Sequence, residues 1–209
     1  MSHEAGRGPG GGLTRRGFFT AVGAAVGAVT LTQVGGTLAP LQDLALLSPR
    51  RPDLGPQPLP VNRTAAAAGV GAADTGADYR LLVDGQVRTP LALSLADLQA
   101  LPQSDAEIAI ACVEGWSASA RWSGVRISDL LRAAGAEPDR RVQVHSLQQH
   151  GNYRSSELDR ARTQDPLTLL ALRLNGERLH LDHGFPARLI APNRPGVLQT
   201  KWVHRVVVL

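Results

Sequence analysis

The stretch Ile110-Ala111-Cys112-Val113-Glu114-Gly115-Trp116-Ser117 leads a short apolar segment into a glycine-containing turn and holds the only cysteine of this 209-residue chain. Residues 107–112 are predicted to form a strand, because apolar residues dominate them and a turn signal follows. Side chains at such a strand end are well placed to line a binding or catalytic site. A single cysteine cannot form an internal disulfide, so Cys112 is a buried apolar residue, a nucleophile or a metal ligand.

The sequence on both sides of this stretch predicts a strand-rich α+β domain without internal repeats. Short helices are expected at residues 95–101, where Ser94 is a suitable N-cap, and at residues 127–134. Residues 167–174 fit either a strand or a buried helix, a choice that periodicity cannot settle, and the turn Asn175-Gly176 follows them. Further strands are predicted at residues 79–83, 142–147, 188–191 and 201–209.

Composition indicates one globular catalytic domain and argues against nucleic-acid binding. Hydrophobic residues make up 43% of the chain and aromatic residues only 4%, so the core must consist mainly of Leu, Val, Ile and Ala. Lys and Arg number 22 against 18 Asp and Glu. The arginines are scattered instead of forming a basic run between aromatic residues, which suits a small anionic ligand better than a nucleic acid.

The N-terminal region resembles a targeting segment. Thr14-Arg15-Arg16-Gly17-Phe18-Phe19 is followed by an apolar run rich in Ala, Gly and Val, an order typical of twin-arginine export signals, which carry folded cargo. An ordinary membrane anchor would use the same residues. We predict a twin-arginine-type signal or retained anchor over residues 1–47, a proline-rich extended linker over residues 48–60 and the catalytic domain over residues 61–209.

Two polar clusters near the C-terminus contain further candidate site residues. The first is Leu181-Asp182-His183-Gly184-Phe185-Pro186-Ala187-Arg188-Leu189, and the second is Asn193-Arg194-Pro195-Gly196-Val197-Leu198-Gln199-Thr200-Lys201-Trp202-Val203. Either cluster alone is compatible with a surface turn. Backbone amides together with Lys and Arg in a bent loop would, however, suit a phosphate or another oxyanion.

Taken together, these motifs resemble the sulfite oxidase family of molybdopterin-binding domains, including its exported bacterial methionine-sulfoxide-reducing branch. Their order and spacing agree with that family over residues 61–209. The motifs are Cys112-Val113-Glu114-Gly115-Trp116-Ser117, Trp122-Ser123-Gly124-Val125, Asp129-Leu130-Leu131, His183-Gly184-x-Pro186-x-Arg188 and Lys201-Trp202-Val203. The resemblance implies a single domain with the α+β sulfite oxidase-type fold, in a bacterial protein.

The resemblance also implies a site for a molybdenum-molybdopterin cofactor. In the family, two dithiolene sulfurs of the pterin and one protein thiolate hold the metal, and the thiolate matches Cys112; a soft thiolate suits such a metal. His183, Arg188 and Lys201 are expected to supply charge-assisted hydrogen bonds to the pterin and its phosphate. The remaining residues that the resemblance assigns to the cofactor are Asn62, Ser146 and Thr200.

The same resemblance gives expectations about the reaction. We expect oxygen-atom or two-electron transfer on a small substrate such as a sulfoxide or sulfite, with Arg121 near the mouth of the site meeting an anionic or oxo-bearing group. Sulfite is the weaker candidate, because the sequence after Cys112 lacks the arginine-rich pattern of sulfite-specific enzymes. The chain lacks the dimerisation and haem domains of larger members, so we expect a separate redox partner, such as a membrane haem or quinone-linked protein.

Two alternatives stay open at the level of sequence. A cysteine nucleophile assisted by His183 and Arg188 would be an exported enzyme of another class. A noncatalytic module for cofactor binding or assembly would keep the fold without turnover. We predict an extracytoplasmic location, in the periplasm or on the outer face of the cell membrane, for all three.

Overall fold

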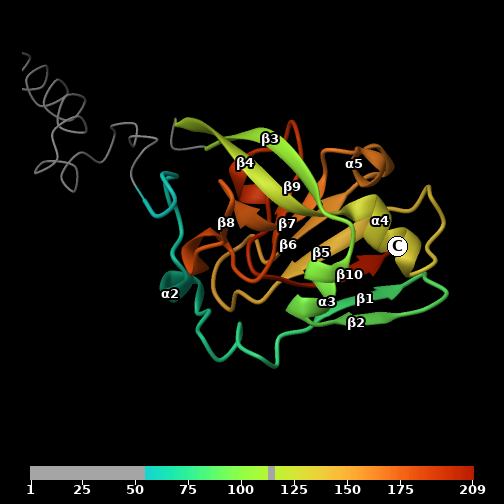
Figure 1. Ribbon diagram of the computed structural model, residues 1–209. Helices are drawn as coiled ribbons and strands as arrows, with labels where there is room; N and C mark the ends of the chain where they lie inside the picture. Colours follow the sequence, from blue (N-terminus) through green and yellow to red (C-terminus); the bar gives the residue numbers. More distant parts are fainter. Residues whose placement is uncertain (1–54, 113–115) are drawn as a thin grey trace, which may run out of the picture. The chain divides into compact units, whose positions relative to one another are not determined.

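The protein is described by a computed structural model for residues 55–112 and 116–209 (Figure 1). Within these residues the first sheet has five strands in the order β2-β1-β10-β5-β6. Strand β10 lies at its centre, parallel to β1 and antiparallel to β5. The bounds are β1 Leu81–Gly85, β2 Leu91–Leu93, β5 Val142–Ser146, β6 Ser155–Leu158 and β10 Val203–Val208.

The second sheet is antiparallel and brings the two strands of the Cys112 hairpin next to the C-terminal polar clusters. Its order is β3-β4-β7-β8, and β9 pairs with the first half of β7 on the same edge as β8. Cys112 directly follows the last residue of β3, as the sequence predicted. The bounds are β3 Ser104–Ala111, β4 Ser117–Arg126, β7 Leu169–Leu174, β8 Glu177–Arg178 and β9 Arg188–Ile190.

The helices are short, and α2, α3 and α5 begin at side-chain N-caps. At the start of α3 the Ser94 side chain accepts from the Asp97 amide, while Asp97 accepts from the Ser94 backbone, which forms a capping box. Thr64 caps α2 and Asp159 caps α5, each through a side-chain oxygen that accepts from a backbone N–H in the first turn. The bounds are α2 Ala65–Ala68, α3 Leu95–Ala100, α4 Ile127–Ala133, α5 Arg160–Gln164 and the 3-10 helices η2 Leu181–His183 and η3 Gly196–Leu198.

Buried apolar side chains occupy both faces of the second sheet. One cluster joins the first sheet to α3, α4 and one face of the second sheet. A second cluster lies on the opposite face, around Trp122 and Ile110, and a third surrounds Trp202. The architecture confirms the predicted strand-rich α+β class. The ambiguous segment 167–174 contains a strand, and its nearly continuous burial explains why periodicity could not identify it.

The end of the predicted linker differs from the expectation. Residues 55–60 contain no helix or strand, as their prolines predict, yet they bend over the domain instead of extending away from it. Leu59 is only 1% exposed and belongs to the second core cluster. The packed domain therefore begins before residue 61, because the apolar side chain at position 59 is buried.

The predicted targeting segment, and the linker up to residue 54, lie outside the described residues. In the part of the chain that the structure describes, helices are too short and insufficiently apolar to cross a bilayer.

Candidate functional site

A pocket opens beside the N-terminal segment 55–63, which we call the strap. Leu59, Pro60, Asn62 and Arg63 of the strap line it. The opposite side consists of the end of β3, the loop after β5 and the chain from η3 to β10. The strap and the two polar clusters, which are far apart in sequence, thus meet at one site.

Cys112 lies next to this pocket, where the β3–β4 hairpin meets η3. Its backbone N–H donates to the Trp116 carbonyl at 2.9 Å. The side-chain amide of Asn62 donates to the sulfur of Cys112. A glycine is needed at position 196, because a Cβ there would lie 3.0 Å from Cγ2 of Ile110 and 3.2 Å from the Ala111 carbonyl oxygen. Close packing of η3 against the end of β3 therefore fixes the surroundings of Cys112.

Arg188 is a buried cation without a carboxylate partner. The residue is 4% exposed, its Nη1 donates to the His183 carbonyl at 3.2 Å, and its guanidinium lies 5.1 Å from the centre of the Trp122 ring. Its buried Nε has no hydrogen-bond partner among the described residues. Burial lowers the pKa of Arg188 to about 9, so the side chain still carries its charge at neutral pH.

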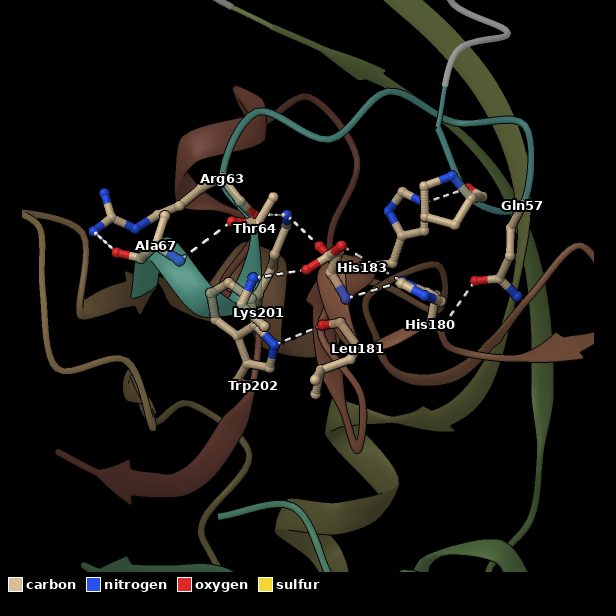
Figure 2. A network of polar contacts seen from close by, with 12 residues as sticks. Gln57, Arg63, Thr64, Ala67, His180, Leu181, His183, Lys201 and Trp202 are labelled. Carbon is tan, nitrogen blue, oxygen red and sulfur yellow. Dashed lines mark hydrogen bonds and ion pairs between the residues drawn. The ribbon is translucent and has the colours of Figure 1, made fainter. Parts of the chain in front are cut away.

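Lys201 brings a second cation to the same pocket. Its ammonium donates to the Asp182 carbonyl at 2.6 Å and to the Arg63 carbonyl at 2.9 Å, as Figure 2 shows. Burial, reinforced by Arg188, lowers the pKa of Lys201 well below its usual value. Both carbonyls are uncharged, and among the described residues no carboxylate forms an ion pair with this ammonium, although the charge of Asp182 offsets part of the lowering of its pKa.

The charges of the pocket lining have one sign. Arg63, Arg188 and Lys201 line it, and among residues 55–112 and 116–209 no carboxylate side chain does. A buried cation is costly unless it is paired. The pocket is therefore suited to a ligand that brings negative charge, and Arg geometry favours phosphate or a similar oxyanion.

His183 is neutral, which differs from the charged donor that the sequence predicted. It is fully buried, and burial lowers its pKa to about 4. Its Nε2 lies 2.6 Å from the Pro56 carbonyl, so Nε2 carries the proton and donates. The buried Nδ1 is then an acceptor, and no described residue donates to it. The sequence did not reveal the burial that sets this protonation state.

Ser146 and Thr200 support the site through structural hydrogen bonds. The Ser146 hydroxyl donates to the Lys201 carbonyl at 2.7 Å, and the Thr200 hydroxyl bonds that of Ser156 at 2.7 Å. Thr200 lines the pocket but Ser146 does not; from the loop after β5 the lining residues are Gln148, Asn152 and Tyr153. The prediction of Ser146 as a contact therefore needs correction, because its hydroxyl holds the backbone before β10.

Arg121 lies away from this site. It pairs across the hairpin with Glu107, five residues before Cys112, which corresponds to about 16 Å along the strand. Its guanidinium forms an exposed ion pair with Asp105 at 2.8 Å. The predicted position at the mouth is wrong, because the β3–β4 register carries Arg121 toward the other end of the hairpin.

Several pocket residues were missed in the sequence. Trp116 is 6% exposed, lines the pocket, and its buried indole N–H has no partner among the described residues. Its position four residues after Cys112 was a signal that could have identified it as a candidate. Tyr153 also lines the pocket although it is 53% exposed. An exposed tyrosine in a polar loop gives no comparable signal.

Comparison with known proteins gives a match over most of the described chain. A family model described as "Oxidoreductase molybdopterin binding domain" matches residues 68–209. A relative from Azospira oryzae, named as a protein-methionine-sulfoxide reductase subunit (YedZ1), is 36% identical over 132 residues, which cover 63% of this chain and 49% of the relative. Mitochondrial sulfite oxidase of Drosophila melanogaster is 33% identical over 156 residues, covering 63% of this chain and 27% of that protein.

A solved structure has a similar fold. The sulfane dehydrogenase SoxCD from Paracoccus pantotrophus matches with a TM-score of 0.58 and 26% identity, covering 63% of this chain and 38% of that chain. The matched part thus amounts to half or less of each of these three proteins.

Proposed function

The chain belongs to the oxidoreductase molybdopterin-binding domain family, and we propose that it is a molybdenum-molybdopterin oxidoreductase whose cofactor lies in the strap pocket. Family membership implies the cofactor. Its place in this chain, the metal ligand and the reaction are our proposals.

The observation that carries this proposal is the set of unbalanced cations in the pocket. Among the described residues, the buried Nε of Arg188 has no hydrogen-bond partner, the Lys201 ammonium donates its hydrogen bonds to two uncharged carbonyls, and no carboxylate lines the pocket. The phosphate tail of a molybdopterin would supply the missing negative charge. The donor set therefore fits the cofactor, with Arg188 and Lys201 holding the tail through charge-assisted hydrogen bonds.

Cys112 is the proposed protein ligand to molybdenum. A soft thiolate suits this metal, and the side-chain amide of Asn62 donates a hydrogen bond to the sulfur. Among residues 55–112 and 116–209 there is no group of three or more His, Cys, Asp or Glu side chains that could hold a metal ion. In our proposal, the other sulfur ligands come from the pterin.

The protein supplies binding and orientation, while the bound cofactor would supply oxygen-atom or two-electron transfer. Trp116 and Ile110 line the pocket beside Cys112 with apolar surface, which excludes water and strengthens the attraction between the cations and an anionic tail. Neutral His183 offers its Nδ1 as a hydrogen-bond acceptor beside Arg188. Such an acceptor suits an N–H group of a pterin ring.

We propose a sulfoxide or sulfite as the substrate class. The relatives named as a sulfoxide reductase subunit and as sulfite oxidase support this choice. The subunit named in the first relative also supports a separate redox partner, for which a membrane haem or quinone-linked protein is our candidate. The arginine pair in residues 14–19 supports export and an extracytoplasmic location, and we propose that residues 1–47 serve as the export signal or anchor.

Elemental analysis and pterin fluorescence of the full chain, produced in a cofactor-competent bacterial host, test the proposal. The wild type should contain molybdenum and pterin in equal amounts. Cys112→Ser should lose most of the molybdenum, and Arg188→Met should lose both components. Arg173→Met is the matched control, because Arg173 is exposed and donates only to the Gly176 carbonyl.

Three results would contradict parts of the proposal. A wild-type protein without molybdenum whose Cys112 is trapped by thiol-reactive substrate analogues would point to a cysteine nucleophile. Normal molybdenum content in Cys112→Ser would remove the thiolate from the metal site. A loaded wild type that turns over no sulfoxide, sulfite or N-oxide would leave a cofactor-binding module without catalysis.

A further inference from the structure

The strap is fastened to the domain at both ends, and the pocket lies against its middle. Leu59 and Pro60 line the pocket, and Leu59 also packs in the second core cluster. No helix or strand forms within residues 55–63. Hydrogen bonds made by individual side chains must therefore hold this segment in place.

Gln57 makes most of the hydrogen bonds at the N-terminal end. Its amide donates to the Arg178 carbonyl at 3.0 Å and to the Leu174 carbonyl at 3.4 Å, and its Oε1 accepts from the His180 N–H at 2.8 Å. Figure 2 shows the last of these bonds. One side chain thus connects the strap to β7, β8 and the start of η2. The left-handed backbone of Gln57, with φ of 55°, makes this position unusual for a residue other than glycine.

A second bond lies beside it. The His183 Nε2–H donates to the Pro56 carbonyl at 2.6 Å (Figure 2). Strap residues 56 and 57 are therefore hydrogen-bonded to residues at the two ends of η2. In the same element, the Asp182 carbonyl accepts from Lys201. The same short helix holds the strap and one of the pocket cations.

The C-terminal end of the strap carries the groups that face the cofactor site. Asn62 donates to the sulfur of Cys112, and the Arg63 carbonyl accepts from Lys201. Arg63 itself donates to the carbonyls of Ala67 and His150. A shift of the strap would therefore move the Asn62 donor away from the sulfur and release one bond of the pocket lysine.

We propose that Gln57 is a positioning residue, which fixes the strap over the pocket and thereby slows the loss of the cofactor. It touches neither the pocket nor Cys112 and acts through Leu59, Pro60 and Asn62. This inference rests on the proposed function, because it presumes a cofactor in the strap pocket. To the proposed function it adds the role of Gln57 and one event, the release of the strap, on which loss of the cofactor depends.

Gln57→Ala tests the inference, and Gln103→Ala is its matched control. Gln103 also donates its amide to two backbone carbonyls, those of Leu98 at 2.9 Å and Leu101 at 2.8 Å, but it is remote from the strap. The measurement is the rate at which molybdenum and pterin leave purified holoprotein in the presence of a chelator. Gln57→Ala should release both about tenfold faster than the wild type, as expected from losing two or three hydrogen bonds. Gln103→Ala should not.

Gln57→Glu separates hydrogen bonding from space filling. The substitution keeps the size of the side chain and the acceptor for His180, but it places a carboxylate against the carbonyls of Leu174 and Arg178. Release should be faster here too, whereas a space-filling role would leave it unchanged. Hydrogen exchange of residues 59–63, measured on both forms, should rise in each Gln57 variant and not in Gln103→Ala.

The outcomes separate this inference from the proposed function. A wild type that never acquires molybdenum would refute the proposed function itself. A wild type that is loaded, with Gln57→Ala and Gln57→Glu releasing the cofactor as slowly as Gln103→Ala, would overturn only the role of Gln57. Poor folding of Gln57→Ala would leave Gln57→Glu, which preserves side-chain volume, to decide between them.

Discussion

Replacing Arg188 with methionine should stabilise the cofactor-free protein while it abolishes cofactor retention. The guanidinium is buried, its Nε is unpartnered, and burial lowers its pKa to about 9. This value lies well below the usual arginine pKa, and because each pKa unit corresponds to about 1.4 kcal/mol, burial of this charge costs roughly 5 kcal/mol. The cost is fully present below pH 9 and diminishes only as the pH rises above that value.

Favourable contacts of Arg188 offset part of this cost. The hydrogen bond to the His183 carbonyl and the contact with the Trp122 ring together contribute about 3 kcal/mol. Removing the charge and keeping an apolar side chain of similar length should therefore stabilise the cofactor-free fold by about 2 kcal/mol, within the range known for buried charges.

Urea unfolding followed by tryptophan fluorescence measures this difference. Cofactor-free wild type, Arg188→Met and the exposed control Arg173→Met would be produced in a host that does not make molybdopterin. The control should stay within about 0.5 kcal/mol of the wild type. In a cofactor-competent host the order should reverse, since only the wild type gains stability from the bound cofactor. A cofactor-free Arg188→Met protein less stable than the wild type would refute the reasoning.

Three further predictions follow from the geometry. Burial lowers the pKa of His183 from 6.5 to about 4, so the unfolded chain binds the proton first as the pH falls. The free energy of unfolding should therefore fall by about 3 kcal/mol between pH 6.5 and pH 4. A pH series of urea curves should show this fall, and His183→Gln should lack it. Arg121→Ala should leave molybdenum content and turnover unchanged, because the side chain pairs with exposed Asp105; a large loss of turnover would restore a role near the site. Gly124→Ala should destabilise the fold by about 3 kcal/mol or more in urea curves, since a Cβ there would lie 2.1 Å from the Leu170 carbonyl oxygen.

The strands could be predicted where local signals were strong. The segment before Cys112 ended at a glycine-containing turn, and the Asn175-Gly176 turn closes the β7–β8 hairpin with φ angles of 51° and 84°. These signals depend on a few adjacent residues. Long-range pairing does not, so the β3–β4 register that places Arg121 away from the site could not be deduced.

The sequence predicted which types of residue lie at the site, but it could not predict their protonation states or the directions of their side chains. Arg188 and Lys201 face one pocket, as expected for anion-binding residues. The neutral state of His183 depends on its burial against the strap, and Ser146 turned out to hold the backbone of Lys201. Both facts arise from packing between segments more than fifty residues apart.

The central position of β10 has a consequence for the order of folding. This strand pairs with β1 through Leu82 and Arg205, which are more than a hundred positions apart, and the pocket residue Lys201 lies two residues before it. Contacts of such sequence separation form slowly. A nascent chain on the ribosome therefore cannot complete the pocket until Val203–Val208 has emerged.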